Sequence, residues 1–121
     1  CIRDSWKTSR APFARRSVMS RPGADRAVVD AGLKSFSLDS GNPEAFNSPG
    51  VRYAKASDEH GVIDLSPDCD GLALGEKMLL VPGHCDPTVN LHDWYVCVRG
   101  MGTADAHVEA VWSVAARGAV F

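Results

Sequence analysis

The sequence lacks the features that would place it in several large functional classes. No apolar run reaches the roughly 18–20 residues that a membrane-spanning helix needs, so we expect a protein without a membrane partner. The sequence also has no Gly-rich phosphate loop, no Ser-His-Asp order and no nucleophile elbow. These absences argue against phosphate-loop nucleotide binding and against serine hydrolase chemistry.

Cysteines are few, and their spacing is not that of a redox or structural metal site. The chain has Cys1, Cys69, Cys85 and Cys97, and no C-x-x-C pair occurs. Cys69 and Cys97 have no Cys or His partner at zinc-finger spacing. Because no secretion signal is present either, we expect reduced thiols, no structural disulfide and a cytoplasmic location.

The formal net charge of −2 conceals a division along the chain. Residues 1–21 carry six Lys or Arg against one acid, whereas the remainder carries seven against fourteen. A basic start is compatible with a targeting peptide or a nucleic-acid-binding arm, but no Lys/Arg-rich face continues it. We therefore expect no nucleic-acid partner. The 121 residues and the 45% hydrophobic content predict one compact domain.

Short β-branched runs separated by Pro, Gly and Asp/Asn dominate the chain, and this pattern favours strands over long helices. Many short strands about ten residues apart predict a mainly β fold, an antiparallel barrel whose closure removes exposed sheet edges. The expected strands are Arg16–Ser20, Arg26–Asp30, Lys34–Leu38, Val51–Ala56, Gly61–Leu65, Lys77–Val81, Trp94–Val98 and Val108–Val114.

Turn chemistry predicts how some of these strands connect. Arg21–Asp25 and Asp39–Pro43 each contain Pro and Gly and predict reversals between strands. Asn42–Gly50 is typical of a mobile surface loop. One short helix is expected after the strand Lys77–Val81, because Asp86 before Pro87 is a helix start signal.

His84 and Asp86 are the candidate metal ligands. They lie two residues apart at the end of an expected strand, and they offer an imidazole nitrogen beside a hard carboxylate oxygen. Such a pair suits a divalent ion and leaves other positions to water or substrate. The alternative is structural: Asp86 caps the short helix and His84 is a turn residue. From the spacing alone this alternative is favoured, because H-x-D is a short pattern.

Other polar and aromatic residues are interpreted structurally. We expect Cys85 to pack and His92 and Asp93 to face solvent. Glu59 and His60 could serve acid–base chemistry, but the same stretch is typical of an ordinary polar hairpin turn. The aromatic residues Trp94, Tyr95 and Trp112 are expected in the core or at an interface rather than in a binding cage.

Several motifs taken together resemble the D-threonine aldolase and D-serine dehydratase-like family. The similarity covers roughly residues 17–120 and is closest to the D-threonine and 3-hydroxy-D-aspartate aldolase branch. The motifs are Val18-Met19-Ser20-Arg21-Pro22, Ala27-Val28-Val29-Asp30-Ala31-Gly32-Leu33-Lys34, Asp39-Ser40-Gly41, Glu59-His60-Gly61 and Pro82-Gly83-His84-Cys85-Asp86-Pro87-Thr88-Val89-Asn90. Their order and spacing reverse the preference at His84 and Asp86 in favour of metal ligation.

The resemblance implies a fold-type III enzyme related to alanine racemase. Its N-terminal barrel would hold pyridoxal 5′-phosphate (PLP) on a lysine, and residues 17–121 would be the C-terminal β domain. That domain would bring a divalent ion of the Mn, Mg or Zn class to a β-hydroxy-D-amino acid through His84 and Asp86. The implied reaction is retro-aldol cleavage to glycine and an aldehyde, in a homodimeric enzyme. The dehydratase branch carries H-x-C, so Asp86 favours the aldolase.

Two departures from the family pattern qualify this expectation. Residues 1–16 do not match the apolar strand expected there and are interpreted as a divergent or truncated start. None of Lys7, Lys34, Lys55 and Lys77 lies in anything like a cofactor-lysine region, so the PLP barrel is absent and the chain alone is expected to be inactive. The remaining alternatives are D-serine dehydratase-type elimination and a stand-alone non-catalytic β domain.

Overall fold

The computed structural model describes residues 13–69 and 71–118, and it contains eight strands and one helix within them. The prediction of a divergent start therefore falls mostly outside the described residues, as does Cys1. No helix in the described part has the length and apolarity to span a membrane. The elements are β1 Ala14–Gly23, β2 Arg26–Val29, β3 Glu44–Ala45, β4 Val51–Ala56, β5 Gly61–Leu65, β6 Lys77–Val81, α1 Cys85–Val89, β7 Trp94–Arg99 and β8 His107–Ser113.

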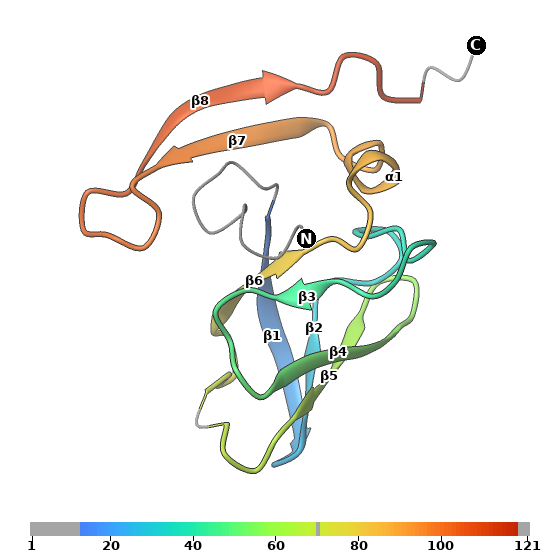
Figure 1. The fold of residues 1–121 in the computed structure, drawn as a ribbon, viewed down its shortest axis with the longest axis vertical. Helices are drawn as coiled ribbons and strands as arrows, with labels where there is room; N and C mark the ends of the chain where they lie inside the picture. Colours follow the sequence, from blue (N-terminus) through green and yellow to red (C-terminus); the bar gives the residue numbers. More distant parts are fainter. Residues whose placement is uncertain (1–12, 70, 119–121) are drawn as a thin grey trace, which may run out of the picture.

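Six of the strands form one sheet in the order β3-β6-β1-β2-β5-β4, and every neighbouring pair is antiparallel. The two outer strands, β3 and β4, also lie in contact, so the sheet nearly closes on itself (Figure 1). Asn42, just before β3, helps to bridge the gap by donating from Nδ2 to the Tyr53 carbonyl at 3.1 Å. The predicted mainly β, barrel-like antiparallel fold with one short helix is confirmed.

The core is apolar and comes from alternate positions of the strands. β5 shows this most clearly, since Gly61, Ile63 and Leu65 are buried while the residues between them are half-buried. This period of two follows from the pleat, which turns successive side chains to opposite faces of a sheet. The largest fully buried side chains are Phe36, Ile63, Leu80, Val18 and Val29.

The predicted strand at Lys34–Leu38 is wrong. This segment forms a turn and an extended connection, in which Leu33 and Lys34 donate backbone hydrogen bonds to the Ser57 and Asp58 carbonyls. Phe36 is buried in the core and Leu38 packs against the core, so the alternation of apolar and polar residues correctly indicates which side chains are buried. The backbone, however, bonds to a hairpin turn rather than to a strand ladder.

The predicted surface loop at Asn42–Gly50 is wrong in part, whereas its mobility stays a prediction. It contains the short strand β3, which pairs with β6, and Pro43 is buried. Its other residues form turns at the surface. The segment therefore contributes one edge of the barrel and is not only a connection.

β7 and β8 form a separate antiparallel ribbon outside the barrel (Figure 1). Trp94 and Trp112 are 61% and 62% exposed, so neither belongs to the core, and the expectation that they lie at an interface stays a prediction. Tyr95 lies opposite Trp112, and Val96 lies opposite Val111 on the other face. Both faces of the ribbon therefore present large apolar side chains to solvent.

Candidate metal centre

The candidate ligands lie where β6 leads into α1. His84 is the N-cap residue of α1, with an extended backbone (φ −139°, ψ 123°), and Asp86 lies in the first helical turn. No side chain caps the helix start. The structural alternative in which Asp86 is the cap is therefore wrong, and its carboxylate is exposed without a hydrogen bond from any residue that the structure describes.

Two glycines bring a second loop beside His84. Gly83 lies against the backbone of Gly41, and a Cβ at position 83 would overlap the Gly41 carbonyl oxygen and come within 2.9 Å of its carbonyl carbon. Gly41 has φ +112°, a conformation that side-chain-bearing residues rarely adopt. The close approach of the two backbones places the turn at Asp39 and Ser40 next to the His84 imidazole.

The His84 imidazole is held by this turn through one nitrogen. Nδ1 lies 2.7 Å from Asp39 Oδ2 and 3.3 Å from Ser40 Oγ. A carboxylate can only accept a hydrogen bond, so Nδ1 carries the proton and donates it to Asp39. In the neutral imidazole the lone pair is then on Nε2, which is the form of histidine that binds metals.

Asp39 is itself fixed by hydrogen bonds. Ser37 Oγ donates to Asp39 Oδ1 at 2.6 Å, and Ser40 Oγ donates to Oδ2 at 3.3 Å. The hydrogen bond from Ser37, followed by that from His84, lowers the pKa of the Asp39 carboxyl to about 2. Asp39 is therefore ionised throughout the neutral range and is available as an acceptor for His84.

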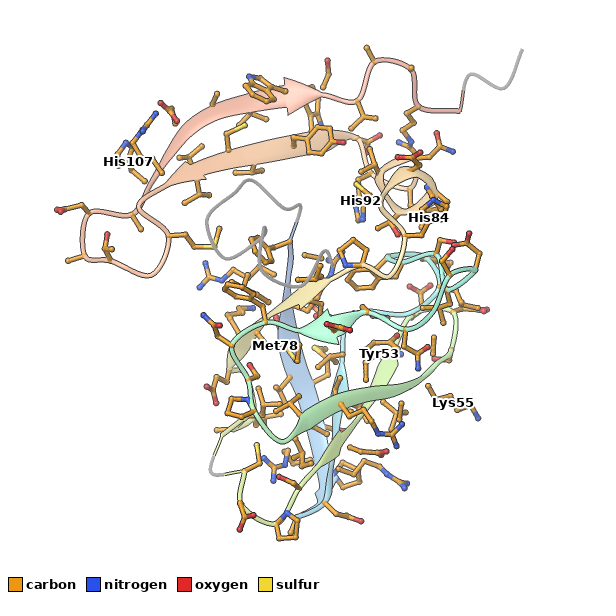
Figure 2. The ribbon with its side chains drawn as sticks, in the orientation of Figure 1. Tyr53, Lys55, Met78, His84, His92 and His107 are labelled. Atoms are coloured by element: carbon orange, nitrogen blue, oxygen red, sulfur yellow. The ribbon has the colours of Figure 1, made fainter. Side chains whose placement is uncertain are left out.

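The helix is attached to the same loop. Thr88, which is 5% exposed, accepts a hydrogen bond at Oγ1 from the Ser37 backbone N–H at 3.2 Å. His92 Nε2 donates to the Ser35 carbonyl at 3.1 Å, so the expectation that His92 faces solvent is wrong. Figure 2 shows His84 and His92 at the α1 end of the molecule, far from His107. Asp93 does face solvent, where it pairs with Arg117.

The donors present fit a weakly held divalent ion. His84 and Asp86 offer one nitrogen and one hard oxygen, both accessible from solvent. Among the described residues no group of three or more His, Cys, Asp or Glu could hold a metal. A divalent ion held by this pair would have its other coordination positions open to water or substrate.

Cys85, between the two candidate ligands, is exposed, so its interpretation as a packing residue is wrong. Desolvation and the neighbouring Asp86 carboxylate raise the pKa of its thiol. Because metals bind the thiolate rather than the thiol, this environment disfavours Cys85 as a ligand. Cys69 and Cys97 are also free thiols.

The Glu59-His60 pair forms an ordinary hairpin turn between β4 and β5. Glu59 pairs with Lys34, and the His60 backbone bonds to Ser57 through both its N–H and its carbonyl. The two side chains do not bond to each other in the structure. The turn interpretation is confirmed.

Sequence reasoning missed the roles of Ser37 and Asp39. Asp39 belongs to the family motif Asp39-Ser40-Gly41, but it is 45 positions from His84 in the sequence and no spacing rule links the two residues. The one sequence signal for this contact is that Gly41 and Gly83 each lie in a turn next to a polar residue, Ser40 and His84 respectively.

Residues 11–98 match the family model described as "Putative serine dehydratase domain", which is more than half of the chain. The chain belongs to this family. The resemblance found in the sequence is thereby confirmed.

Relatives of this serine dehydratase-like domain are aldolases. It is 51% identical over 116 residues to the 3-hydroxy-D-aspartate aldolase of Paracoccus denitrificans, covering 95% of this chain and 28% of that enzyme. It is 45% identical over 106 residues to the D-threonine aldolase of an Arthrobacter species, covering 88% and 27%. The crystal structure of D-threonine aldolase from Filomicrobium marinum matches with a TM-score of 0.83 at 50% identity, over 90% of this chain and 29% of that one. The domain thus spans less than a third of each relative.

Proposed function

We propose that this domain carries the metal-binding half of the active site of a PLP-dependent lyase acting on β-hydroxy-D-amino acids. The observation that carries the proposal is the His84 imidazole held through Nδ1, whose Nε2 has no hydrogen-bond partner among the described residues, at the start of the helix whose first turn carries the exposed Asp86. The identity to two aldolases of such substrates supports it. His84 and Asp86 are the proposed ligands of a Mn, Mg or Zn ion.

The role of the domain in the reaction follows from these residues. His84 and Asp86 would hold the ion at the start of α1 and would leave its other positions open to a substrate hydroxyl. A divalent ion bound there supplies Lewis acidity toward the β-hydroxyl group. PLP, held elsewhere in the full-length enzyme, supplies the electron sink for Cα–Cβ cleavage. Asp39 keeps the proton of the imidazole on Nδ1, away from the ion.

Retro-aldol cleavage is preferred over elimination because of the ligand at position 86. The Asp86 oxygen is a hard donor, which suits Mn²⁺ or Mg²⁺ better than a cysteine thiolate would. Desolvation and the Asp86 carboxylate raise the pKa of the Cys85 thiol, which disfavours this neighbouring soft donor. D-serine dehydratase-type elimination is the second candidate, since the family model is that of a dehydratase domain.

We further propose that the domain works against a PLP-bearing domain, and that the β7–β8 ribbon is its contact surface. The domain covers only 27–29% of its relatives. The placement of the described lysines supports the proposal that the lysine that binds PLP lies in another domain. Lys34 pairs with Glu59, Lys77 donates to Ser17 and Lys55 points into solvent (Figure 2). A two-stranded ribbon with apolar side chains on both faces is marginal in water without a partner. This disfavours a stand-alone domain.

Metal binding tests the ligand assignment directly. Mn²⁺ and Zn²⁺ titrations against a competing chelator would be made with the wild-type chain, His84→Ala and Asp86→Ala. Asp64→Asn is the matched control, because Asp64 pairs with Arg52 on the barrel. We expect saturable 1:1 binding that both ligand variants weaken and the control retains. No saturable binding by the wild type, or equal affinity in all four proteins, overturns the assignment.

A chimera tests the reaction. The matching 29% of the Filomicrobium marinum D-threonine aldolase would be replaced by this chain. We expect the chimera to cleave D-threonine and D-3-hydroxyaspartate to glycine, and the same chimera with His84→Ala to lose this activity. Formation of pyruvate from D-serine, without aldol cleavage, would favour the dehydratase. A chimera that folds and binds PLP but shows neither reaction would support a non-catalytic domain.

A further inference from the structure

We propose that Asp39 is a positioning residue for the metal centre: it selects the Nδ1–H tautomer of His84 and fixes the ring, so that Nε2 is the nitrogen offered to the ion. The inference rests on the proposed metal-binding function and deepens it. It assigns a role to a residue 45 positions away from His84 in the sequence.

The geometry allows only one assignment of the ring nitrogens. The distance of 2.7 Å between Nδ1 and Asp39 Oδ2 is that of a charge-assisted hydrogen bond. Two acceptors, the Asp39 carboxylate and Ser40 Oγ at 3.3 Å, converge on the same nitrogen. Rotating the ring by half a turn would break the bond to the carboxylate and would place a carbon atom there. Nδ1 is therefore occupied, and Nε2 is the only ring nitrogen that remains for an ion.

This contact differs from an ordinary surface ion pair. Both side chains are partly exposed, 43% for His84 and 51% for Asp39, and an isolated exposed pair would hold neither in place. Here the carboxylate is anchored at its other oxygen by Ser37 Oγ at 2.6 Å. The Ser37 backbone is anchored in turn by Thr88 on α1, the helix that carries Asp86. Hydrogen bonds through Ser37 thus connect α1, the helix that carries the proposed ligand Asp86, to Asp39. Asp39 in turn orients the imidazole of the other proposed ligand, His84.

The backbone supports the same arrangement independently. The contact between Gly41 and Gly83 has no room for a side chain at position 83, and it sets the distance between the Asp39 turn and His84. A histidine that ligates a metal commonly donates its other N–H to a carboxylate, and loss of such a partner typically weakens metal affinity about 10- to 100-fold. The structure supplies this partner, and Asp39 is the only carboxylate among the described residues that bonds to His84.

The first test reads the tautomer without metal. Long-range ¹H–¹⁵N spectra of the metal-free chain at mildly alkaline pH would report which nitrogen of His84 is protonated, with His84→Ala providing the assignment. We expect the Nδ1–H form in the wild type and a mixture containing Nε2–H in Asp39→Ala. Asp39→Asn should restore most of the Nδ1–H form, since an amide oxygen still accepts the bond. A wild-type imidazole protonated on Nε2 overturns the inference.

The second test measures metal affinity in the same proteins. We expect Mn²⁺ affinity to fall about 10- to 100-fold in Asp39→Ala and less in Ser37→Ala, which leaves the carboxylate in place but removes its anchor. Asp64→Asn is the control for loss of a surface carboxylate. Backbone spectra of each variant establish that the barrel is intact, and Ser37→Ala keeps the test decisive if Asp39→Ala does not fold.

The two tests separate the inference from the proposed function. Wild-type binding that is lost in His84→Ala but unchanged in Asp39→Ala and Ser37→Ala overturns the positioning role and leaves the ligand assignment standing. Absence of wild-type binding, even with the expected tautomer, overturns the proposed function and the inference with it. A loss in Asp39→Ala that Asp39→Asn partly recovers, together with the tautomer change, supports both.

Discussion

Gly83→Ala is the substitution that most directly tests how the candidate site is built. The added Cβ would overlap the Gly41 carbonyl oxygen, so the backbones of the two loops would have to separate. Both partners are main chain, and neither can move away by a simple rotamer change. Overpacking of this kind typically costs about 1–3 kcal/mol. For a domain of this size a loss of 1 kcal/mol corresponds to a decrease in Tm of roughly 4–8 °C.

The same displacement would separate His84 from Asp39. We therefore expect Gly83→Ala to lower both Tm, measured by circular dichroism, and Mn²⁺ affinity, measured by chelator competition. Gly71→Ala is the matched control, because a Cβ at Gly71 would meet nothing within 4 Å and its backbone is not in the positive-φ region. The control should stay within about 0.5 kcal/mol of the wild type. A Gly83→Ala protein with wild-type Tm and metal affinity would refute the proposed contact between the loops.

Two further predictions concern pH and the ribbon. The pKa of Asp39 is lowered from 3.8 to about 2 in the folded state, so its contribution to stability is complete above the unfolded pKa and is lost as pH falls through about 2. The Tm difference between the metal-free wild type and Asp39→Asn should therefore shrink as pH falls from 3.8 through about 2, and a difference that is undiminished at pH 2 contradicts this. For the ribbon, Trp94→Ser with Trp112→Ser should weaken the association of this chain with a separately supplied PLP-bearing domain in sedimentation experiments and change the barrel's Tm little, since both side chains are more than half exposed. A large loss of Tm would show that these indoles are needed by the barrel itself.

Strand positions were the most predictable part of the fold. Val51–Ala56, Gly61–Leu65 and Lys77–Val81 form strands with the expected bounds, because each run is β-branched or apolar and ends at a turn residue. Lys34–Leu38 has the same alternation and is not a strand. Alternation indicates which side chains are buried, and Phe36 is buried, but it does not determine where the backbone N–H groups find acceptors.

The candidate site was predictable only in part for a similar reason. His84 and Asp86 are close in sequence and could be recognised as a pair with a known chemistry. Asp39 and Ser37 reach His84 only because Gly41 and Gly83 let two distant turns meet. That contact is a property of the folded backbone, and a single sequence does not report it.

The barrel core and the proposed metal ligands are separate parts of the molecule. The buried cluster consists of hydrophobic residues from the strands and from Ala31, Phe36 and Leu72 between them, whereas His84, the N-cap of α1, is half-buried and Asp86, in its first turn, is exposed. A small domain that folds around zinc collapses when the metal is chelated. Here the ion would be an exchangeable component, and removing it should leave a folded apoprotein that can bind metal again. The supply of metal in the cell would then determine the fraction of the protein that is active and not the fraction that is folded.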